Sequence, residues 1–324
     1  MKAIVHTEYG PPEVLRLQEV PNPAPKADEV LVKVHAASVN AADWRLLMAH
    51  PFLVRLYNGL LRPKRQVLGA DVAGIVEAVG KDVSRLRPGD AVFADLAHHG
   101  WGGFAEYACA REDAWAAKPA GVSFADAATL PTAGITALQG LRDAGKLKAG
   151  EAVLINGASG GVGTFAVQLA KHLGAIVTAV CSAGKAEMVR TLGADRVIDY
   201  GQEDFTRRTD RYDLIFAVNG YHPILDYKRA LRPNGRYVMA GGTAAQMFEA
   251  LLLGPLVFMA SGKKMTSASW SPNPKDLALL AALVEAGKLK PLIETHYPLS
   301  GVPDAIRHLA DGHARAKVVI DVAA

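Results

Sequence analysis

Cysteine is scarce in this sequence. Its 324 residues include two cysteines, Cys109 and Cys181, which stand far apart in the chain. A pair with this spacing provides neither a framework of disulfides nor a cysteine-rich zinc site, since both need several thiols. We therefore expect a protein of a reducing compartment, and we predict a cytoplasmic location.

An excess of charge of one sign is absent as well. The 36 lysines and arginines stand against 32 aspartates and glutamates, which leaves a formal charge of +4 spread along the chain. Binding to nucleic acid relies on a concentrated positive surface, so this balance argues against a nucleic-acid partner.

No hydrophobic run is long enough to span a membrane. The most apolar stretch, residues 250–260, is about half the length that a bilayer requires, and Pro255 interrupts it. Residues 1–6 have the pattern of a short strand and lack the apolar core and cleavage site of a signal peptide. We expect no membrane span, and we interpret 250–260 as a buried or interface segment.

Two patterns divide the chain. Up to about residue 122, short apolar stretches such as 30–36, 71–80 and 91–94 alternate with turn residues, which is typical of a compact β unit. From there to about 261, apolar strands alternate with helical stretches, which indicates a parallel sheet with helices on both faces. The strands predicted in this second region are 152–156, 176–181, 196–198, 214–217 and 236–240. A helix at 275–287 and a strand at 316–322 follow.

Three glycines at three-residue spacing lie between a predicted strand and a predicted helix of the second region. Gly157, Gly160 and Gly163 follow the strand 152–156 and open the helix. The first glycine permits a tight turn, the second lets a pyrophosphate approach the backbone, and the third lets helix and strand pack closely. The helix N-terminus also offers unpaired N–H groups and the positive end of its dipole. The turn predicts that the chain binds a dinucleotide.

An acidic residue is missing where an NAD-binding chain would have one. Residues 180–185, at the end of the second strand, contain no carboxylate to bind the ribose 2′-hydroxyl. A carboxylate would repel a 2′-phosphate, whereas hydroxyl and ammonium groups such as those of Ser182 and Lys185 bind it. We therefore predict NADPH as the cofactor.

Short segments that occur in order along the whole chain carry a family resemblance. They lie at residues 10–15, 38–43, 68–74, 102–107, 130–137, 156–163, 192–195, 199–200 and 312–320. With them the chain resembles the medium-chain dehydrogenase/reductase superfamily, and within it the zinc-independent quinone oxidoreductase-like branch. The resemblance implies an α/β protein in which a GroES-like β-barrel domain, 1–122 completed by 268–324, carries an inserted Rossmann domain, 123–267, with a doubly wound parallel sheet. The active site would lie in the cleft between the two domains.

The same resemblance implies which residues hold the cofactor. Ser182, Lys185 and Tyr200 would surround the 2′-phosphoadenosine, and Asn40 would stand beside the nicotinamide ring as the catalytic candidate. The residues implied for the pyrophosphate and the nicotinamide half are Thr132, Ser159, Gly160, Gly161, Val162, Val218, Gly241, His313, Arg315 and Lys317.

The residues that bind zinc in alcohol dehydrogenases of this superfamily are replaced. By the resemblance, Asn40 stands in the place of a cysteine and Ala70 in the place of a histidine. Zinc prefers sets of thiolate and imidazole ligands, so we predict a metal-free protein. Without a Lewis acid to hold an alkoxide, hydride transfer needs an acceptor that is already electrophilic, such as a quinone or an α,β-unsaturated carbonyl compound.

Alternatives stay open for the reaction and for its proton donor. NADPH-dependent carbonyl or alcohol chemistry is one alternative, and a cofactor-binding structural protein with little turnover is another. Asn40 could donate a hydrogen bond to the nicotinamide carboxamide or to the substrate oxygen. The proton could come from Arg45, His50 or Tyr57, or from solvent. Asp43 is expected to brace its loop, since a carboxylate beside a developing anion would be unfavourable.

The segment that follows the fifth predicted strand has two expected roles. Residues 250–260 would be a core helix or a hydrophobic wall for the substrate. In this superfamily an edge strand near 264–269 commonly pairs with its twin in a second subunit, and an unpaired apolar edge would invite aggregation. We therefore expect a homodimer.

Overall fold

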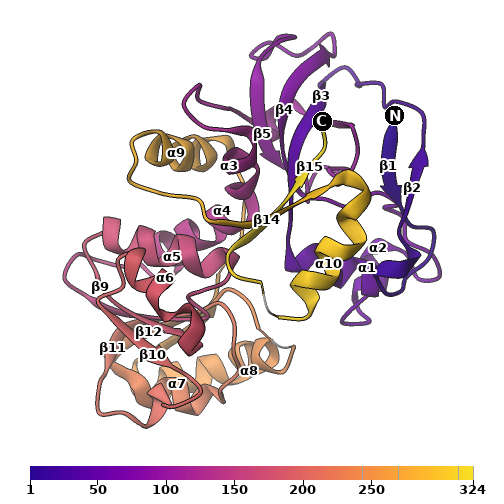
Figure 1. The fold of residues 1–324 in the computed structure, drawn as a ribbon. Helices are drawn as coiled ribbons and strands as arrows, with labels where there is room; N and C mark the ends of the chain where they lie inside the picture. The colour runs from indigo at the N-terminus through magenta and orange to yellow at the C-terminus, as the bar shows by residue number, and fades with distance from the viewer. Residues whose placement is uncertain (243, 269, 313, 324) are drawn as a thin grey trace. The chain divides into compact units, whose positions relative to one another are not determined.

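The computed structural model describes residues 1–242, 244–268, 270–312 and 314–323. By its internal contacts the chain divides into two compact units. Unit 1 comprises Met1–Thr132, Pro272–Gly287 and Pro291–Ala324, and unit 2 comprises Ala133–Ser271 and Lys288–Lys290. Each unit has one large β-sheet of its own (Figure 1). The expected domain boundaries at residues 122 and 267 stay a prediction.

The large sheet of unit 1 is mainly antiparallel. Over the described residues its order is β14-β15-β3-β4-β5-β7, and β6 pairs with β3. A separate antiparallel pair, β1 with β2, belongs to the same unit. The strands are β1 (Lys2–Val5), β2 (Arg16–Glu19), β3 (Glu29–Val39), β4 (Asp71–Val79), β5 (Ala91–Asp95), β6 (Tyr107–Arg111), β7 (Trp115–Ala117), β14 (Ile293–Pro298) and β15 (Lys317–Asp321).

The C-terminal strand is an inner strand of this sheet. β15 lies between β14, to which it is parallel, and β3, to which it is antiparallel. Its first four residues are buried, because both faces and both edges are covered. Figure 1 shows this yellow segment returning to lie beside the indigo β3. The strands predicted at 30–36, 71–80, 91–94 and 316–322 are confirmed.

Several helices of unit 1 were not predicted from the sequence. α1 begins after Asn40, whose side chain forms a capping box with Asp43, and its two turns are too short to give a clear hydrophobic period. The helix predicted at 275–287 is confirmed as α9 (Pro274–Glu285). The other helices of unit 1 are α1 (Ala41–Met48), α2 (Val54–Asn58), α3 (Phe124–Thr129) and α10 (Val302–Ala310), with the short turns η1 (Pro12–Val14), η2 (Glu112–Ala114) and η6 (Leu299–Gly301).

The sheet of unit 2 is parallel throughout its described residues. Its strand order is β10-β9-β8-β11-β12-β13. The chain adds strands on one side of β8 up to β10 and then on the other side from β11, which is the doubly wound order of dinucleotide-binding domains. The strands are β8 (Ala152–Asn156), β9 (Ile176–Cys181), β10 (Arg196–Asp199), β11 (Tyr212–Ala217), β12 (Leu231–Met239) and β13 (Lys264–Ser267). The sequence predicted the first five of these, and β12 begins five residues earlier than expected.

Helices accompany the strands of unit 2 along the chain. They are α4 (Pro131–Gln139, whose first two residues belong to unit 1), α5 (Gly161–His172), α6 (Ala186–Thr191), α7 (Ile224–Ala230) and α8 (Ala244–Ser261), with the turns η3 (Gly140–Ala144), η4 (Ala183–Lys185) and η5 (Phe205–Arg207). The core under α7 and α8 contains Tyr227, Tyr237 and Val257, all buried.

The apolar run 250–260 lies within α8. Val257 is buried, whereas Leu252, Leu256 and Met259 are exposed. The run is therefore one helix with a buried side and an exposed side. Among the described residues, no helix has the length and the apolar character that crossing a bilayer would take.

Candidate functional site

The glycine turn joins β8 to α5 in the way that its spacing predicts. Gly157 has a φ of +86°, and a Cβ there would come within 2.7 Å of the Asn219 nitrogen. A Cβ on Gly163 would come within 2.1 Å of the Gly157 oxygen. On Gly160, by contrast, a Cβ would meet only the Gly157 oxygen, at 3.8 Å. The first and third glycines are required for close packing, and the second leaves open space over the backbone.

The start of α5 has no side-chain cap. Its N-cap residue is Gly160, and no side chain accepts a hydrogen bond from the first turn. The first N–H groups of an α-helix have no partner within the helix, so those of Gly161 and Val162 are available to a ligand. Together with the helix dipole they favour an anion at residues 159–162. The pyrophosphate of a dinucleotide fits this arrangement.

Two neighbouring strands end beside this turn and bring the predicted 2′-phosphate residues together. Cys181 of β9 pairs in register with Asp199 of β10, so Ser182 and Tyr200 follow at adjacent strand ends. The Tyr200 nitrogen donates to the Cys181 oxygen at 3.2 Å. The turn η4 follows Ser182 and ends at Lys185, and both of these side chains are half-buried.

The ends of β11 and β12 lie on the other side of the turn. The Val218 nitrogen donates to the Asn156 oxygen at 2.9 Å, and a Cβ on Gly241 would come within 2.3 Å of the Val218 oxygen. The structure therefore brings all the candidate residues of unit 2 to the carboxyl edge of one sheet. These are Ser159, Gly160, Gly161, Val162, Ser182, Lys185, Tyr200, Val218 and Gly241.

The candidate residues of unit 1 separate into two groups. Asn40, Thr132 and Lys317 belong to one cluster of polar side chains in its interior. Arg315 is exposed, and its backbone nitrogen donates to Glu294 Oε2 at 2.6 Å. His313 lies outside the described residues.

Lys317 is the centre of the interior cluster. It is only 2% exposed. Its Nζ donates to Asn40 Oδ1 at 2.7 Å and lies 3.3 Å from Asp71 Oδ2. Asn40 Nδ2 donates to the same Asp71 oxygen at 2.9 Å, and so does the Ser38 hydroxyl, also at 2.9 Å. The Asn40 amide is thus held on both its oxygen and its nitrogen side, and the lysine cation interacts inside unit 1.

Asp71 and Asp95 share the hydroxyl of Thr132. Thr132 Oγ1 lies 2.7 Å from Asp71 Oδ1 and 3.0 Å from Asp95 Oδ2. A hydroxyl has one proton, so it cannot donate to two carboxylates. Both contacts are satisfied when the Asp95 carboxyl is itself protonated and donates to Thr132. Burial, followed by the charge of Asp71, raises the pKa of Asp95 to about 7, which agrees with this arrangement.

Asp43 braces its loop as the sequence suggests. Its two carboxylate oxygens accept hydrogen bonds from the backbone nitrogens of Asn40, at 2.7 Å, and Gly69, at 3.0 Å. Burial raises the pKa of this carboxyl to about 7, because desolvation penalises the charged form.

Sequence reasoning missed three members of the cluster: Ser38, Asp71 and Asp95. Asp71 opens β4 and Asp95 closes β5, and the two pair directly across the sheet. Each acid at a strand end has the pattern of a solvent-exposed residue, so only the register of the strands reveals that they meet. The motif at 68–74 contained Asp71, but nothing in the sequence linked it to Lys317.

The cluster does not fit a zinc ion. Asn40 and Ala70 offer neither thiolate nor imidazole. The ammonium group of Lys317 already binds the oxygens of Asn40 and Asp71, so a divalent cation would meet a buried positive charge. Within the described part of the chain, no three His, Cys, Asp or Glu side chains are grouped to hold a metal.

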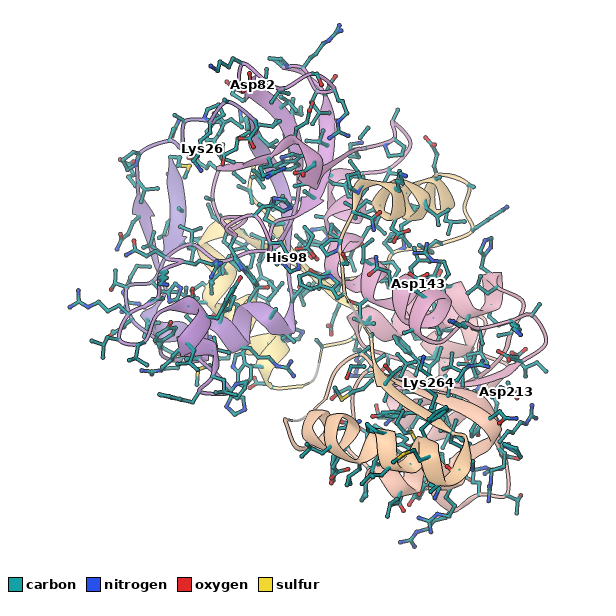
Figure 2. All side chains as sticks on the ribbon, turned by 180° about the vertical axis from the view of Figure 1, so that it is seen from behind. Lys26, Asp82, His98, Asp143, Asp213 and Lys264 are labelled. Carbon is teal, nitrogen blue, oxygen red and sulfur yellow. The ribbon has the colours of Figure 1, made fainter. Side chains whose placement is uncertain are left out.

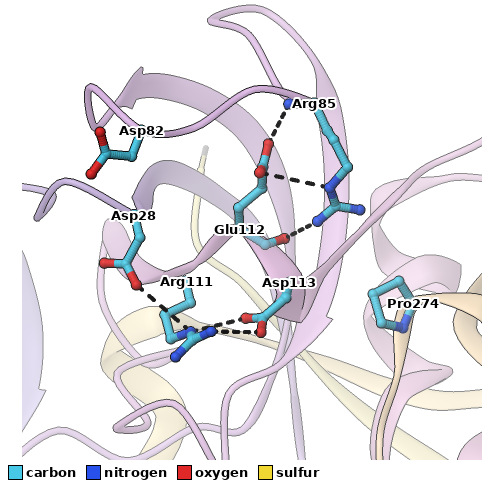
Figure 3. Close-up of a pocket in the computed structure, with 7 residues that line it drawn as sticks. All are labelled: Asp28, Asp82, Arg85, Arg111, Glu112, Asp113 and Pro274. Carbon is cyan, nitrogen blue, oxygen red and sulfur yellow. Dashed lines mark hydrogen bonds and ion pairs between the residues drawn. The ribbon is translucent and has the colours of Figure 1, made fainter.

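A hollow on the surface of unit 1 is lined mainly by charged side chains (Figure 3). Arg111 lies 3.8 Å from Asp28 and 3.0 Å from Asp113, and the Nε atom of Arg85 lies 3.7 Å from Glu112. Glu112 Oε1 also accepts the Leu86 nitrogen at 3.1 Å. Because these charges bind one another, the hollow is explained by the packing of the β6 end, and it adds no residue to the candidate site.

We predict that protonation of Asp95 makes stability depend on pH. Its pKa rises from 3.8 to about 7 on folding, so between these values the folded state holds a proton that the unfolded state has lost. This contribution is fully present below about pH 4 and is lost as the pH rises through about 7. Asp95→Asn is uncharged and keeps a donor toward Thr132, so its unfolding free energy should fall less over this range.

The measurement is the urea unfolding midpoint at about pH 5 and about pH 8 for each protein. The exposed Asp311→Asn variant, which should behave like the wild type, is the control. Equal pH dependence in Asp95→Asn and wild type would show that Asp95 is not protonated in the folded state.

Known proteins similar to this chain identify its family. The description "Alcohol dehydrogenase GroES-like domain" matches residues 26–120, and "Zinc-binding dehydrogenase" matches residues 192–320. A chloroplast envelope quinone oxidoreductase homolog from Arabidopsis thaliana is 36% identical, over 99% of this chain and 98% of its own. An NADPH-dependent alkenal/one oxidoreductase from the same plant is 34% identical, over 99% of this chain and 79% of its own.

A solved structure agrees with these relatives. The quinone oxidoreductase from Coxiella burnetii is 33% identical, with a TM-score of 0.88 over 100% of this chain and 99% of that one. The expected GroES-like fold with a parallel-sheet Rossmann domain is confirmed. The chain belongs to the medium-chain dehydrogenase/reductase superfamily, in its quinone oxidoreductase-like branch.

Proposed function

We propose that this protein is an NADPH-dependent oxidoreductase that reduces a quinone or an activated α,β-unsaturated carbonyl compound. The observation that carries the proposal is the carboxyl edge of the unit 2 sheet, where an uncapped helix start meets Ser182 and Lys185 with no carboxylate between them. Relatives named as a quinone oxidoreductase homolog and as an NADPH-dependent alkenal/one oxidoreductase support both the cofactor and the acceptor class.

The residues of unit 2 bind and orient the cofactor in this proposal. The backbone N–H groups of Gly161 and Val162 hold the pyrophosphate, and Ser182 and Lys185 bind the 2′-phosphate through charge-assisted hydrogen bonds. Tyr200, exposed at the next strand end, covers the adenine side. NADPH, when bound, supplies the hydride that the acceptor receives.

The nicotinamide half has candidate contacts in both units. Val218 and Gly241 are the candidates at the ends of β11 and β12, which pack closely because Gly241 has no side chain to meet the Val218 oxygen. The candidates from unit 1 for this half of the cofactor are Thr132, His313 and Arg315. Arg315 is an exposed cation suited to a phosphate. Lys317 acts by holding Asn40.

Asn40 serves as a fixed polar group beside the reacting centre. Its Nδ2 atom lies 2.9 Å from Asp71 Oδ2 and 3.4 Å from the Ser38 oxygen, so both amide protons have partners inside unit 1. The side chain orients neighbouring groups and does not give up a proton. We propose solvent as the proton source for the reduced product.

We also infer that the reaction needs no zinc. The candidate ligand positions hold an amide and a methyl group, and the nearby carboxylate is paired with Lys317. Without an ion to polarise a simple carbonyl, the substrate must be electrophilic itself. This restricts the acceptor to a small hydrophobic quinone or enone.

The first prediction of this proposal is turnover with activated acceptors. Under anaerobic conditions, a water-soluble benzoquinone or an alkenone should accelerate NADPH oxidation. One hydroquinone or one saturated ketone should form for each NADPH consumed. Prior incubation with a chelator should leave the rate unchanged. Product analysis by chromatography identifies which bond is reduced.

Each other outcome has a clear meaning. An allylic alcohol as product would favour carbonyl reduction instead. Tight NADPH binding with no acceleration by any acceptor would identify a cofactor-binding protein with little turnover. A chelator-sensitive rate would contradict the zinc-free mechanism.

The second prediction concerns the choice of cofactor. Lys185→Glu should weaken NADPH binding by roughly 1–3 kcal/mol and leave NADH binding nearly unchanged, because it replaces a charge-assisted contact to the 2′-phosphate with repulsion. Calorimetric titration with both cofactors measures the effect. Lys148→Glu, which makes the same charge change before the start of β8 and so at the opposite edge of the sheet, is the control. If the ratio of NADPH affinity to NADH affinity is unchanged in Lys185→Glu, Lys185 does not bind the 2′-phosphate.

The third prediction concerns a homodimer formed through β13. This strand, which begins at Lys264 (Figure 2), is the last of the described strands of the unit 2 sheet; Ser269, at the end of the expected edge strand, lies outside the described residues. The Ala268 nitrogen donates to Met239 of β12, so the Ser267 N–H points to the open side. Ser267→Pro removes that donor and should convert a dimer to a monomer in sedimentation velocity. A monomeric wild type would contradict the dimer.

The proposed location is the cytoplasm or another reducing compartment. Cys109 and Cys181 are both free thiols. Burial raises the pKa of Cys109 to about 12, and burial raises that of Cys181 as well, which keeps both thiols protonated and unreactive.

A further inference from the structure

The connection between β3 and β4 presents apolar side chains to solvent. It comprises residues 40–70 and contains α1 and α2. The exposed fraction is 69% for Leu56 and 85% for Leu61. The large apolar side chains exposed in this connection are Met48, Phe52, Leu53, Leu56, Tyr57, Leu60 and Leu61. We call these seven, together with Arg62 and Lys64, the basic apolar patch.

The interior of this connection contains a polar side chain as well as apolar ones such as Leu47 and Leu68. Asn58, at the end of α2, is 0% exposed, while the leucines around it face outward. The Asn58 backbone oxygen accepts the Lys64 nitrogen at 2.6 Å, and the Tyr9 hydroxyl donates to the Gly59 oxygen at 2.7 Å. Polar contacts therefore hold residues 58–64 in place, while Leu56, Leu60 and Leu61 remain exposed. Exposed apolar patches rimmed by polar groups mark binding surfaces.

From residue 44 onward the charge of the connection is of one sign. Residues 44–70 contain five cationic side chains and no acid, namely Arg45, Arg55, Arg62, Lys64 and Arg65. The acids on either side, Asp43 and Asp71, are both 0% exposed and do not neutralise the surface.

The cations lie against the apolar side chains. The Arg65 guanidinium stacks 4.4 Å from the centre of the Tyr57 ring, and that of Arg55 lies 5.6 Å from the Phe52 ring. Arg62 and Lys64 are exposed and form no ion pair with an acid of the described residues. The surface is thus apolar and positive at once.

These two properties decide between the possible occupants. A second copy of the chain, docked by two-fold symmetry, would bring the same cations against one another. A membrane span is ruled out for this segment, since α1 and α2 have eight and five residues. The interface of an anionic bilayer satisfies both properties, because lipid headgroups bind the cations and the acyl boundary takes up leucine and aromatic side chains.

We propose that the basic apolar patch docks this protein reversibly on the surface of an anionic lipid bilayer. The proposal does not depend on the reaction proposed above, since it concerns residues outside the cofactor-binding edge. A protein without quinone or enone reduction would still dock.

The test is co-sedimentation of the full chain with extruded vesicles. We expect binding to vesicles of equal parts phosphatidylcholine and phosphatidylglycerol, and weak binding to phosphatidylcholine alone. The double variant Arg62→Glu with Lys64→Glu should bind the anionic vesicles at least about tenfold more weakly. Leu56→Ser with Leu61→Ser should also weaken binding, because the apolar contact is lost.

Matched variants provide the controls. Lys81→Glu with Lys288→Glu makes the same change in net charge at exposed positions outside the patch, one in each unit, and Leu225→Ser removes an exposed leucine of α7. Both should bind like the wild type. Circular dichroism melting checks that each variant is folded. Oxidation of NADPH with a water-soluble quinone, without vesicles, is recorded for each one.

Three results would overturn the proposal. The first is no preference of the wild type for anionic vesicles. The second is equal loss of binding in the patch variants and their controls, which would indicate a general charge effect. The third is vesicle binding that is unchanged in the patch variants while their sedimentation or their rate with the soluble quinone changes, which would identify the patch as a subunit contact or a substrate wall.

Discussion

The buried ammonium group of Lys317 joins three strands that are far apart in the sequence. It begins β15, contacts Asn40 after the end of β3, and pairs with Asp71 at the start of β4. Burying a cation or a carboxylate alone is costly, and the cost is offset only when the pair is close and its remaining hydrogen bonds are satisfied. Ser38 and Thr132 satisfy them here. The placement of Asn40, and with it the polar interior of unit 1, depends on this pair.

The two units solve different physical problems. Unit 2 offers backbone N–H groups to an anion, and this arrangement depends on backbone conformation: the glycines of the turn and the uncapped start of α5. Unit 1 fixes a single amide in a nearly dry interior, so its requirements fall on charge balance among one lysine and three aspartates. The first problem is solved by residues close in sequence, and the second by residues that only tertiary pairing brings together.

This difference explains what the sequence could predict. The glycine turn, five strands of unit 2 and the missing acid after β9 are local patterns, and the structure has them where they were expected. The interior cluster could not be predicted from the sequence, because strand register brings Asp71 and Asp95 together. Helix α2 was missed for another reason. Its exposed Leu56 and buried Asn58 contradict the rule that apolar side chains lie inside, and predictions from hydrophobic patterns rely on that rule.

The inner position of β15 has a consequence for folding during synthesis. Nearly all of unit 2 is continuous in sequence, from Ala133 to Ser271, and its parallel sheet can form while later residues are still in the ribosome. Unit 1 begins earlier in the chain, yet its sheet has a gap between β14 and β3 until residues 317–321 emerge. The β3 edge at residues 36–39 therefore lacks its neighbouring strand, and Asp71 lacks its lysine partner, through most of translation. The half of the protein that is made first is the half that is finished last.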